Sequence, residues 1–310
     1  MTIPQQLAGQ LAIPAIVAPM FLISGPDLVV ECCKAGLLGT FPALNQRTTD
    51  GFVAWLDEIE RRLDGHAAPY GVNLIVHRTN SRLHTDLDVI VKRKVPLVIT
   101  SLGTVREVID AVHGYGGLVF HDVINIRHAR KAAEAGVDGL IAVCAGAGGH
   151  AGLLSPFALV PEIRAFFNKT ILLSGVLSTG RHVAAARMIG ADLAYLGTRF
   201  IATRESIVPQ EFKNMILSSR AEDIVYTAAI SGVHGNFLRP SIEAAGVEID
   251  LSASNKQLSV GQHEKRAWKN IWSAGQGVGS SDDVPATADL CARLVREYRD
   301  ALQEACADLR

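Results

Sequence analysis

The sequence lacks any marked excess of charge of one sign. Its 30 lysines and arginines nearly balance 31 aspartates and glutamates, the formal net charge is −1, and no five like charges follow one another. Nucleic acids and anionic membrane surfaces attract strongly basic proteins. The balance of charge therefore gives no reason to expect either of them as a partner.

Long hydrophobic runs are also missing. No apolar stretch reaches the roughly 18 residues that a membrane-spanning helix needs, and the first residues lack the basic and apolar segments of a signal peptide. The five cysteines form no CxxC pair, and their odd number suits reduced thiols. We therefore expect a soluble, cytoplasmic protein without a metal site.

Two glycine-rich nucleotide signatures are absent as well. Neither GxGxxG nor GxxxxGK[ST] occurs in the chain. The sequence thus supports neither a Rossmann dinucleotide site nor a P-loop.

What the sequence does contain is a regular alternation of short apolar runs and amphipathic segments. Eight apolar runs, each followed by a helical pattern, begin before residue 200: 15–20, 38–41, 71–76, 96–101, 117–121, 139–144, 171–174 and 193–196. Strands this apolar are typical of a parallel sheet covered by helices. The pattern predicts an α/β protein with a closed (β/α)8 TIM barrel. A doubly wound sheet is the alternative, and it would usually use fewer strands.

The pattern changes after the eighth apolar run. We predict that residues 1–203 form the barrel and that residues 204–282, which are rich in turns, form a smaller, partly helical cap inserted after strand 8. Residues 283–310 are predicted to form a last helix that packs on the barrel, because Leu290 and Leu294 recur at helical spacing.

One glycine-rich stretch follows the sixth apolar run. Residues 145–152 read AGAGGHAG and place His150 among residues with almost no side chain. Glycine allows a flat ligand to approach the backbone closely, and histidine has a pKa near physiological pH. This stretch is a candidate for the reactive centre, although a glycine-rich turn with a surface histidine would read the same way.

Two further glycines follow strands seven and eight, where barrels of this kind often bind a phosphate. Small residues expose backbone N–H groups, and a following helix start favours an anion. A flat phosphorylated cofactor across the barrel mouth, such as FMN, fits this pattern. Met20 would then lie under the ring system, with Asn73 and Thr100 reaching it from strands three and four. The candidate phosphate residues are Ser174, Gly175, Val176, Leu196, Gly197 and Thr198.

At this point the sequence resembles the nitronate monooxygenase family, formerly called 2-nitropropane dioxygenases. The matching motifs, in chain order, are Ala18-Pro19-Met20, Gly148-Gly149-His150 with Gly152, Leu159-Val160-Pro161, Ser174-Gly175-Val176 with Thr179-Gly180, Gly190-Ala191-Asp192, Gly197-Thr198-Arg199-Phe200 with Ala202-Thr203, and Ser273-Ala274-Gly275-Gln276-Gly277. The resemblance implies an FMN-dependent barrel that oxidises alkyl nitronates with O2 to carbonyl compounds and nitrite, and it leaves open whether neutral nitroalkanes are also substrates. It also implies that His150 is the catalytic residue and that Ala18, Pro19, Gly148 and Gly149 lie against the cofactor.

The resemblance has two departures. Many members carry a lysine in the loop after strand five, where this chain has Asp122, so we place Asp122 beside the cofactor with altered local charge. Residues 231–239 replace a more arginine-rich stretch. His121 and His234 are expected to be ordinary loop histidines, and His128 and His182 surface residues of helices.

Three readings of function stay open at this stage. The first is the nitronate monooxygenase, which acts on a small-molecule substrate without a metal or a reduced nicotinamide. The second is an NAD(P)H-dependent FMN reductase of quinones or enoyl thioesters on the same barrel, because one fold serves several chemistries. The third is a ligand-binding barrel without turnover. Homo-oligomer formation is left open.

Overall fold

A computed structural model describes residues 2–63, 65, 67–103, 106–247 and 270–307. Eight parallel strands close into a barrel, because β1 pairs with β2 on one side and with β9 on the other. The barrel strands are β1 (Ala15–Val17), β2 (Leu38–Pro42), β3 (Gly71–Ile75), β4 (Leu97–Ser101), β5 (Leu118–Val123), β6 (Gly139–Val143), β8 (Thr170–Ser174) and β9 (Leu193–Leu196). The predicted (β/α)8 barrel is confirmed, and the doubly wound alternative is wrong.

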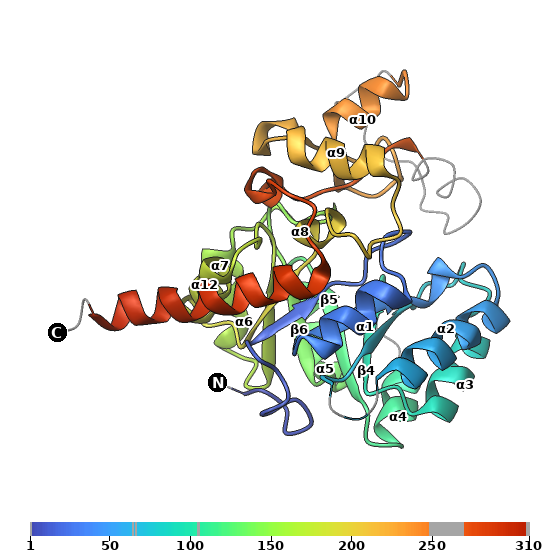
Figure 1. The fold of residues 1–310 in the computed structure, drawn as a ribbon. Coiled ribbons are helices and arrows are strands. Elements are labelled where there is room, and N and C mark those ends of the chain that lie inside the picture. The colour runs from blue at the N-terminus through green and yellow to red at the C-terminus, as the bar shows by residue number, and fades with distance from the viewer. Residues whose placement is uncertain (1, 64, 66, 104–105, 248–269, 308–310) are drawn as a thin grey trace.

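Helices between the strands cover the outside of the barrel (Figure 1). They are α1 (Pro26–Lys34), α2 (Thr49–Arg62), α3 (Leu83–Arg93), α4 (Arg106–His113), α5 (Ile126–Ala135), α6 (Pro156–Arg164) and α7 (Gly180–Ile189). The short helix α8 (Thr198–Ile201) follows the last strand, and the 3-10 turn η1 (Ala43–Asn45) precedes α2. Side chains of Thr48, Asn125, Ser155 and Thr179 cap helix N-termini by accepting a backbone N–H.

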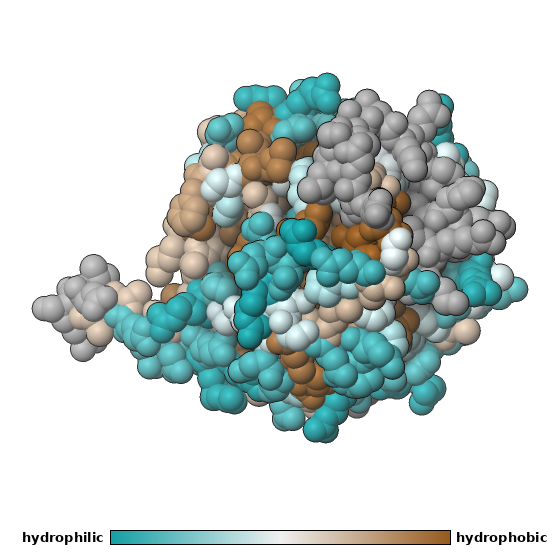
Figure 2. Space-filling view, turned by 90° about the horizontal axis from the view of Figure 1, so that it is seen from above, coloured by the Kyte–Doolittle hydropathy of each residue, from teal (hydrophilic) through white to brown (hydrophobic). Residues whose placement is uncertain are grey.

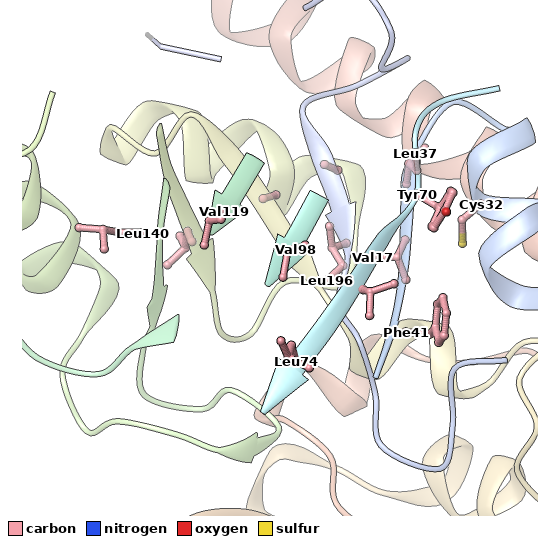
Figure 3. Close-up of a cluster of buried hydrophobic side chains, with 14 of the residues drawn as sticks. Val17, Cys32, Leu37, Phe41, Tyr70, Leu74, Val98, Val119, Leu140 and Leu196 are labelled. Atoms are coloured by element: carbon pink, nitrogen blue, oxygen red, sulfur yellow. The ribbon is translucent and has the colours of Figure 1, made fainter. Parts of the chain in front are cut away.

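Alternate residues of each strand serve two different layers of the core. Leu97, Ile99 and Phe120 belong to the cluster that fills the barrel interior. Val98 and Val119 belong to the larger cluster that the strands share with the surrounding helices, part of which Figure 3 shows. Successive side chains of a strand point to opposite faces. A residue's place in this alternation therefore decides whether its side chain reaches the barrel mouth.

A cap sits over one end of the barrel (Figure 1). It comprises α9 (Gln210–Ser218), η2 (Ala221–Asp223), β10 (Ile224–Thr227), β11 (Gly235–Leu238), α10 (Arg239–Ala244) and η3 (Gln276–Ser280). The cap is not only helical: β10 and β11 form a three-stranded sheet with β7 (Gly149–His150), which lies in the glycine-rich stretch. Residues 248–269 of the predicted cap lie outside the described residues.

The C-terminal helix α12 (Thr287–Ala307) runs along α7 (Figure 1). The two helices approach so closely that a Cβ on Gly180 would stand 2.1 Å from the Leu294 carbonyl oxygen. The backbone N–H of Gly180 donates to Glu297 Oε2 at 2.7 Å. Within the described ranges, no helix is long and apolar enough to cross a membrane.

Candidate active site

A cavity of about 1230 Å³ lies between the carboxyl ends of the barrel strands and the cap. In TIM barrels this is the end that carries the active site. Most of the predicted site residues line it: Ala18, Pro19, Met20, Asn73, Asp122, Gly148, Gly149, His150, Ser174, Gly175, Val176, Gly197 and Thr198. Residues far apart in the chain thus meet at one cavity. Viewed from the cap end, hydrophobic residues are visible on the cap and near the centre of this face (Figure 2).

Two predicted contacts, Thr100 and Leu196, are not part of this lining. Thr100 is buried, and its Oγ1 lies 2.7 Å from His121 Nδ1. Thr100 points to the same outer face of β4 as Val98, and Leu196 points to the same outer face of β9 as Ala194. Ser101, one residue after Thr100, lines the cavity instead. Because successive residues of a strand point to opposite faces, Ser101 faces the cavity and Thr100 does not.

Asp122 is at the end of β5 and not in the loop after it, because this strand runs to Val123. Asn73 Nδ2 donates to Ser101 Oγ at 2.7 Å, and the Ser101 hydroxyl donates to Asp122 Oδ2. Asp122 Oδ1 is buried and has no hydrogen-bond partner among the described residues. Burial raises the pKa of this carboxyl to about 6, and the bond from Ser101 opposes the rise. The cavity therefore contains a polar chain that ends in an unpaired acceptor.

His150 belongs to β7, and its backbone lies opposite Gly235 of β11 in the antiparallel register. Its Nε2 lies 3.3 Å from Ser231 Oγ, a cap residue that the sequence analysis did not select. Burial lowers the pKa of the imidazole to about 4, because a low-dielectric surrounding disfavours the charged form. The ring is therefore neutral at pH 7.

The loops after β8 and β9 form a wall with little side-chain bulk. Gly175 has φ +129°, and a Cβ there would stand 3.1 Å from the Ala145 carbonyl oxygen. Val176 follows with φ +59°, an uncommon conformation for a β-branched residue. Strained residues of this kind cluster at ligand-binding sites. On the neighbouring loop, Thr198 Oγ1 accepts the Gly275 N–H at 2.8 Å. Helix α7 begins at Gly180, five residues after Gly175.

These features fit a flat phosphorylated cofactor such as FMN. The loops with Gly175 and Gly197, which we call the glycine wall, leave room for a phosphate beside backbone N–H groups. A Cβ on Gly197 would stand 3.7 Å from Met20 Sδ, so the side chain of Met20 and the wall share one corner of the cavity. The unpaired Asp122 Oδ1 calls for a donor from a bound ligand, and the imide N–H of an isoalloxazine is a donor of that kind.

The other histidines differ from what we expected. His121 is buried in β5, not in a loop, and burial lowers the pKa of its ring to about 4. His234 does lie in a loop, but its ring stacks on Tyr226 with centroids 5.1 Å apart, and both residues line the cavity. His128 is only partly exposed and lines the cavity too. His182 Nδ1 accepts the Ser178 N–H at 3.1 Å, a role inside the loop that begins α7.

The apolar part of the cavity wall contains residues that were not among the predicted site residues. Phe212 of α9 and Trp272 stack with ring centroids 4.6 Å apart, and both line the cavity together with Phe21 and Val208. Tyr195 of β9 lines the opposite, barrel side. For Tyr195 the signal was available, since it shares the inward phase of Leu193. No local sequence pattern predicts that Trp272 stacks on a residue of α9.

No group of three or more His, Cys, Asp or Glu side chains in the described part of the chain is arranged to hold a metal ion.

The fold and the cavity together define a TIM barrel that takes a small-molecule ligand at its carboxyl-terminal mouth. Comparison with known proteins places it more narrowly. The sequence model described as nitronate monooxygenase matches residues 77–297, more than half of the chain. The chain belongs to this family and is a flavin-dependent oxidoreductase.

Three relatives illustrate the range of the family. The chain is 24% identical to a nitronate monooxygenase of Paraburkholderia phytofirmans, over 94% of this chain and 93% of that protein. It is also 24% identical to the (3aS,4S,5R,7aS)-5-hydroxy-7a-methyl-1-oxo-octahydro-1H-indene-4-carboxyl-CoA dehydrogenase of Rhodococcus jostii, over 92% of each chain. The solved nitroalkane oxidase of Streptomyces ansochromogenes has the same fold, with a TM-score of 0.82 at 23% identity over 97% of this chain and 100% of that one.

Proposed function

We propose that this protein is an FMN-dependent nitronate monooxygenase that converts alkyl nitronates and O2 into carbonyl compounds and nitrite. The observation that carries the proposal is a partly buried, neutral His150 on a glycine-rich loop that lines the same cavity as the glycine wall of Gly175 and Gly197. Family membership supports the flavin chemistry.

The residues of the cavity divide into two groups by what they would hold. The loops with Gly175 and Gly197 would bind the phosphate of FMN, and Met20 with Pro19 would lie against its ring system. Gly149 leaves open space where the ring would approach the loop of His150, and Gly148 lets this loop pack against the Ala274–Gly275 backbone. Bound FMN supplies the electron acceptor for the substrate. Thr100 and Leu196 do not line the cavity and would act only through neighbouring residues.

His150 would act on the substrate as a neutral imidazole. A ring with a pKa of about 4 is a weak base at pH 7, so it is poorly matched to removing the α-proton of a neutral nitroalkane. A nitronate has already lost that proton, so its oxidation needs no base of that strength. The low pKa therefore favours the nitronate over the parent nitroalkane as the substrate.

The cap contributes an apolar roof to this reaction space. Phe212 and Trp272 stand above the barrel mouth with their rings stacked. Apolar walls exclude water from the charged substrate and strengthen the hydrogen bonds that it accepts. The rings would also hold an alkyl chain by hydrophobic contact.

Steady-state turnover tests this proposal directly. The purified, FMN-loaded protein is mixed in air with a primary alkyl nitronate and, separately, with the parent nitroalkane at the same concentration. We expect O2 consumption and nitrite formation with the nitronate, and a rate at least about 10-fold lower with the nitroalkane. Absence of nitrite with both substrates would overturn the proposal.

A second candidate is an NAD(P)H-dependent FMN reductase that acts on an enoyl thioester or a quinone. The observation that favours it is the size of the cavity, which at about 1230 Å³ exceeds the roughly 300–1,000 Å³ of most small-ligand sites. The similarity to a dehydrogenase named for a carboxyl-CoA compound also supports a larger substrate. Oxidation of NADPH that depends on an enoyl thioester would establish this activity.

We place the activity in the cytoplasm. The cysteines of the described residues are all free thiols, and four of them are buried. Free thiols persist in a reducing compartment.

A further inference from the structure

The cap holds the glycine-rich loop by its backbone on both sides of His150. Gly235 and Asn236 of β11 pair with His150 and Gly149 of β7. Asn236 Nδ2 also donates to the Ala147 carbonyl oxygen at 2.6 Å. The Gly149 N–H donates to Ser273 Oγ at 2.7 Å, and this hydroxyl donates in turn to the Asn236 carbonyl oxygen at 2.5 Å. The cap is thus part of the support of His150 and not only a lid above it.

The same cap reaches the imidazole ring through Ser231, which is only 7% exposed. The Ser231 hydroxyl has a single proton. Its Oγ lies 3.0 Å from the Val233 carbonyl oxygen, and a carbonyl oxygen can only accept. The proton of Ser231 is therefore committed to Val233.

The direction of the second contact follows from the first. Ser231 Oγ lies 3.3 Å from His150 Nε2. Since the hydroxyl proton is already used, Oγ can only accept in this contact, and Nε2 must carry the hydrogen. A neutral imidazole has one N–H, so the lone pair lies on Nδ1.

We propose that Ser231 is a positioning residue of the cap that holds His150 in the tautomer protonated at Nε2. Its meaning for catalysis rests on the proposed function of His150. The tautomer itself does not, because the Ser231 and Val233 contacts define it. Under this proposal the cap contributes to the chemistry through the ring of His150 as well as through the shape of the cavity.

The test is long-range proton–nitrogen NMR of the full-length, FMN-loaded protein with labelled histidine at pH 7.5. The signals of His150 are assigned from their loss in His150→Gln. In the wild type we expect a protonated Nε2, an unprotonated Nδ1 and an Nε2–H signal protected from exchange with water. In Ser231→Ala the Nε2–H should lose this protection, and Ser231→Thr, which keeps the hydroxyl, should retain it.

Turnover gives a second readout. Loss of one hydrogen bond to the ring should lower kcat by roughly 2- to 12-fold in Ser231→Ala, while Ser231→Thr stays within about twofold of the wild type. Ser280→Ala changes an exposed cap serine outside the cavity lining and serves as the matched control. Thermal melting and FMN content identify any variant that fails to fold.

Two results would overturn the proposal: a wild-type His150 protonated at Nδ1, or an Nε2–H equally protected in Ser231→Ala. Neither depends on which substrate is oxidised. Conversely, failure to oxidise nitronates with the Nε2–H tautomer intact would overturn the proposed function and leave the role of Ser231 standing.

Discussion

Gly235 of the cap lies directly opposite His150 across the antiparallel pair formed by β11 and β7. A Cβ at Gly235 would stand 2.8 Å from the Gly149 carbonyl oxygen, a distance that such atoms do not tolerate. The cap strand and the strand of the candidate catalytic histidine are therefore packed backbone against backbone. Any side chain at Gly235 must push them apart.

Gly235→Ala tests the importance of this packing. We expect the free energy of unfolding to fall by about 1–3 kcal/mol through overpacking, and kcat to fall by at least about 10-fold because His150 moves with β7. Gly279→Ala is the control, since its Cβ would meet nothing closer than Arg220 Cδ at 3.6 Å. Denaturant unfolding and nitrite formation measure the two effects. Wild-type turnover in Gly235→Ala would show that β7 does not need the cap strand at this distance.

His150→Ala should retain FMN and the fold but lower kcat by about 10² to 10⁴, the range for a positioned acid–base group. The variant removes the imidazole, and the other residue of β7 is a glycine that cannot replace it. His84→Ala, at an exposed position of α3, is the matched histidine control. Nitrite assays and the flavin spectrum provide the measurements. If His150→Ala turned over at the wild-type rate, His150 would not be the catalytic residue.

Gly175→Asp should lose FMN, because the variant adds bulk and negative charge where the phosphate is proposed to lie. Gly175→Ala separates the two causes: it brings the steric contact and the strain of φ +129° without the charge. We expect both to weaken FMN binding, and Gly175→Asp to do so by at least about tenfold more. Fluorescence titration of the apoprotein with FMN measures this difference. Equal affinity in the two variants would argue against a phosphate at this wall.

Asp122→Asn should change the pH dependence of stability. The pKa of Asp122 is raised to about 6 in the folded protein, so the folded state binds a proton that the unfolded state releases above pH 4. This contribution stabilises the protein fully below pH 4 and is lost as the pH rises through 6. Between pH 5 and 8 the wild type should lose about 1–2 kcal/mol relative to Asp122→Asn.

The histidines with lowered pKa values must be separated from this effect of Asp122. His121 and His150 have lowered pKa values of about 4, so their contribution runs in the opposite direction and is lost as the pH falls from 6.5 toward 4. Both proteins retain these histidines, so the difference between them isolates the carboxyl. Urea unfolding at pH 5 and 8 gives the comparison. Parallel pH profiles for the two proteins would mean that Asp122 is charged throughout this range.

The barrel was predictable because each strand repeats the same signal. Eight apolar runs with helices between them leave few alternatives. The position of two loops after strands seven and eight makes them candidates for a phosphate site, which stays a prediction. The phase within a strand was harder to assign: Thr100 was chosen where Ser101 faces the cavity. Asp122 was expected in the loop after strand five from the family resemblance, whereas β5 runs to Val123.

The contacts of the cap lie beyond what local patterns can show. A two-residue strand such as Gly149–His150 has no periodicity, and its partner Gly235 lies some 85 positions along the chain. Ser231 carries no signal either, because its role depends on a ring brought to it by that pairing. The assignment of the site residues to FMN and nitronate remains a prediction.

Anaerobic stopped-flow absorbance of the FMN-loaded protein tests the central claim most directly. The protein is mixed with an alkyl nitronate in one experiment and with NADPH or NADH in the other. The account predicts that the nitronate reduces the flavin rapidly and that neither nicotinamide bleaches it. Rapid bleaching by a reduced nicotinamide with no reaction toward the nitronate would contradict the account and identify a reductase.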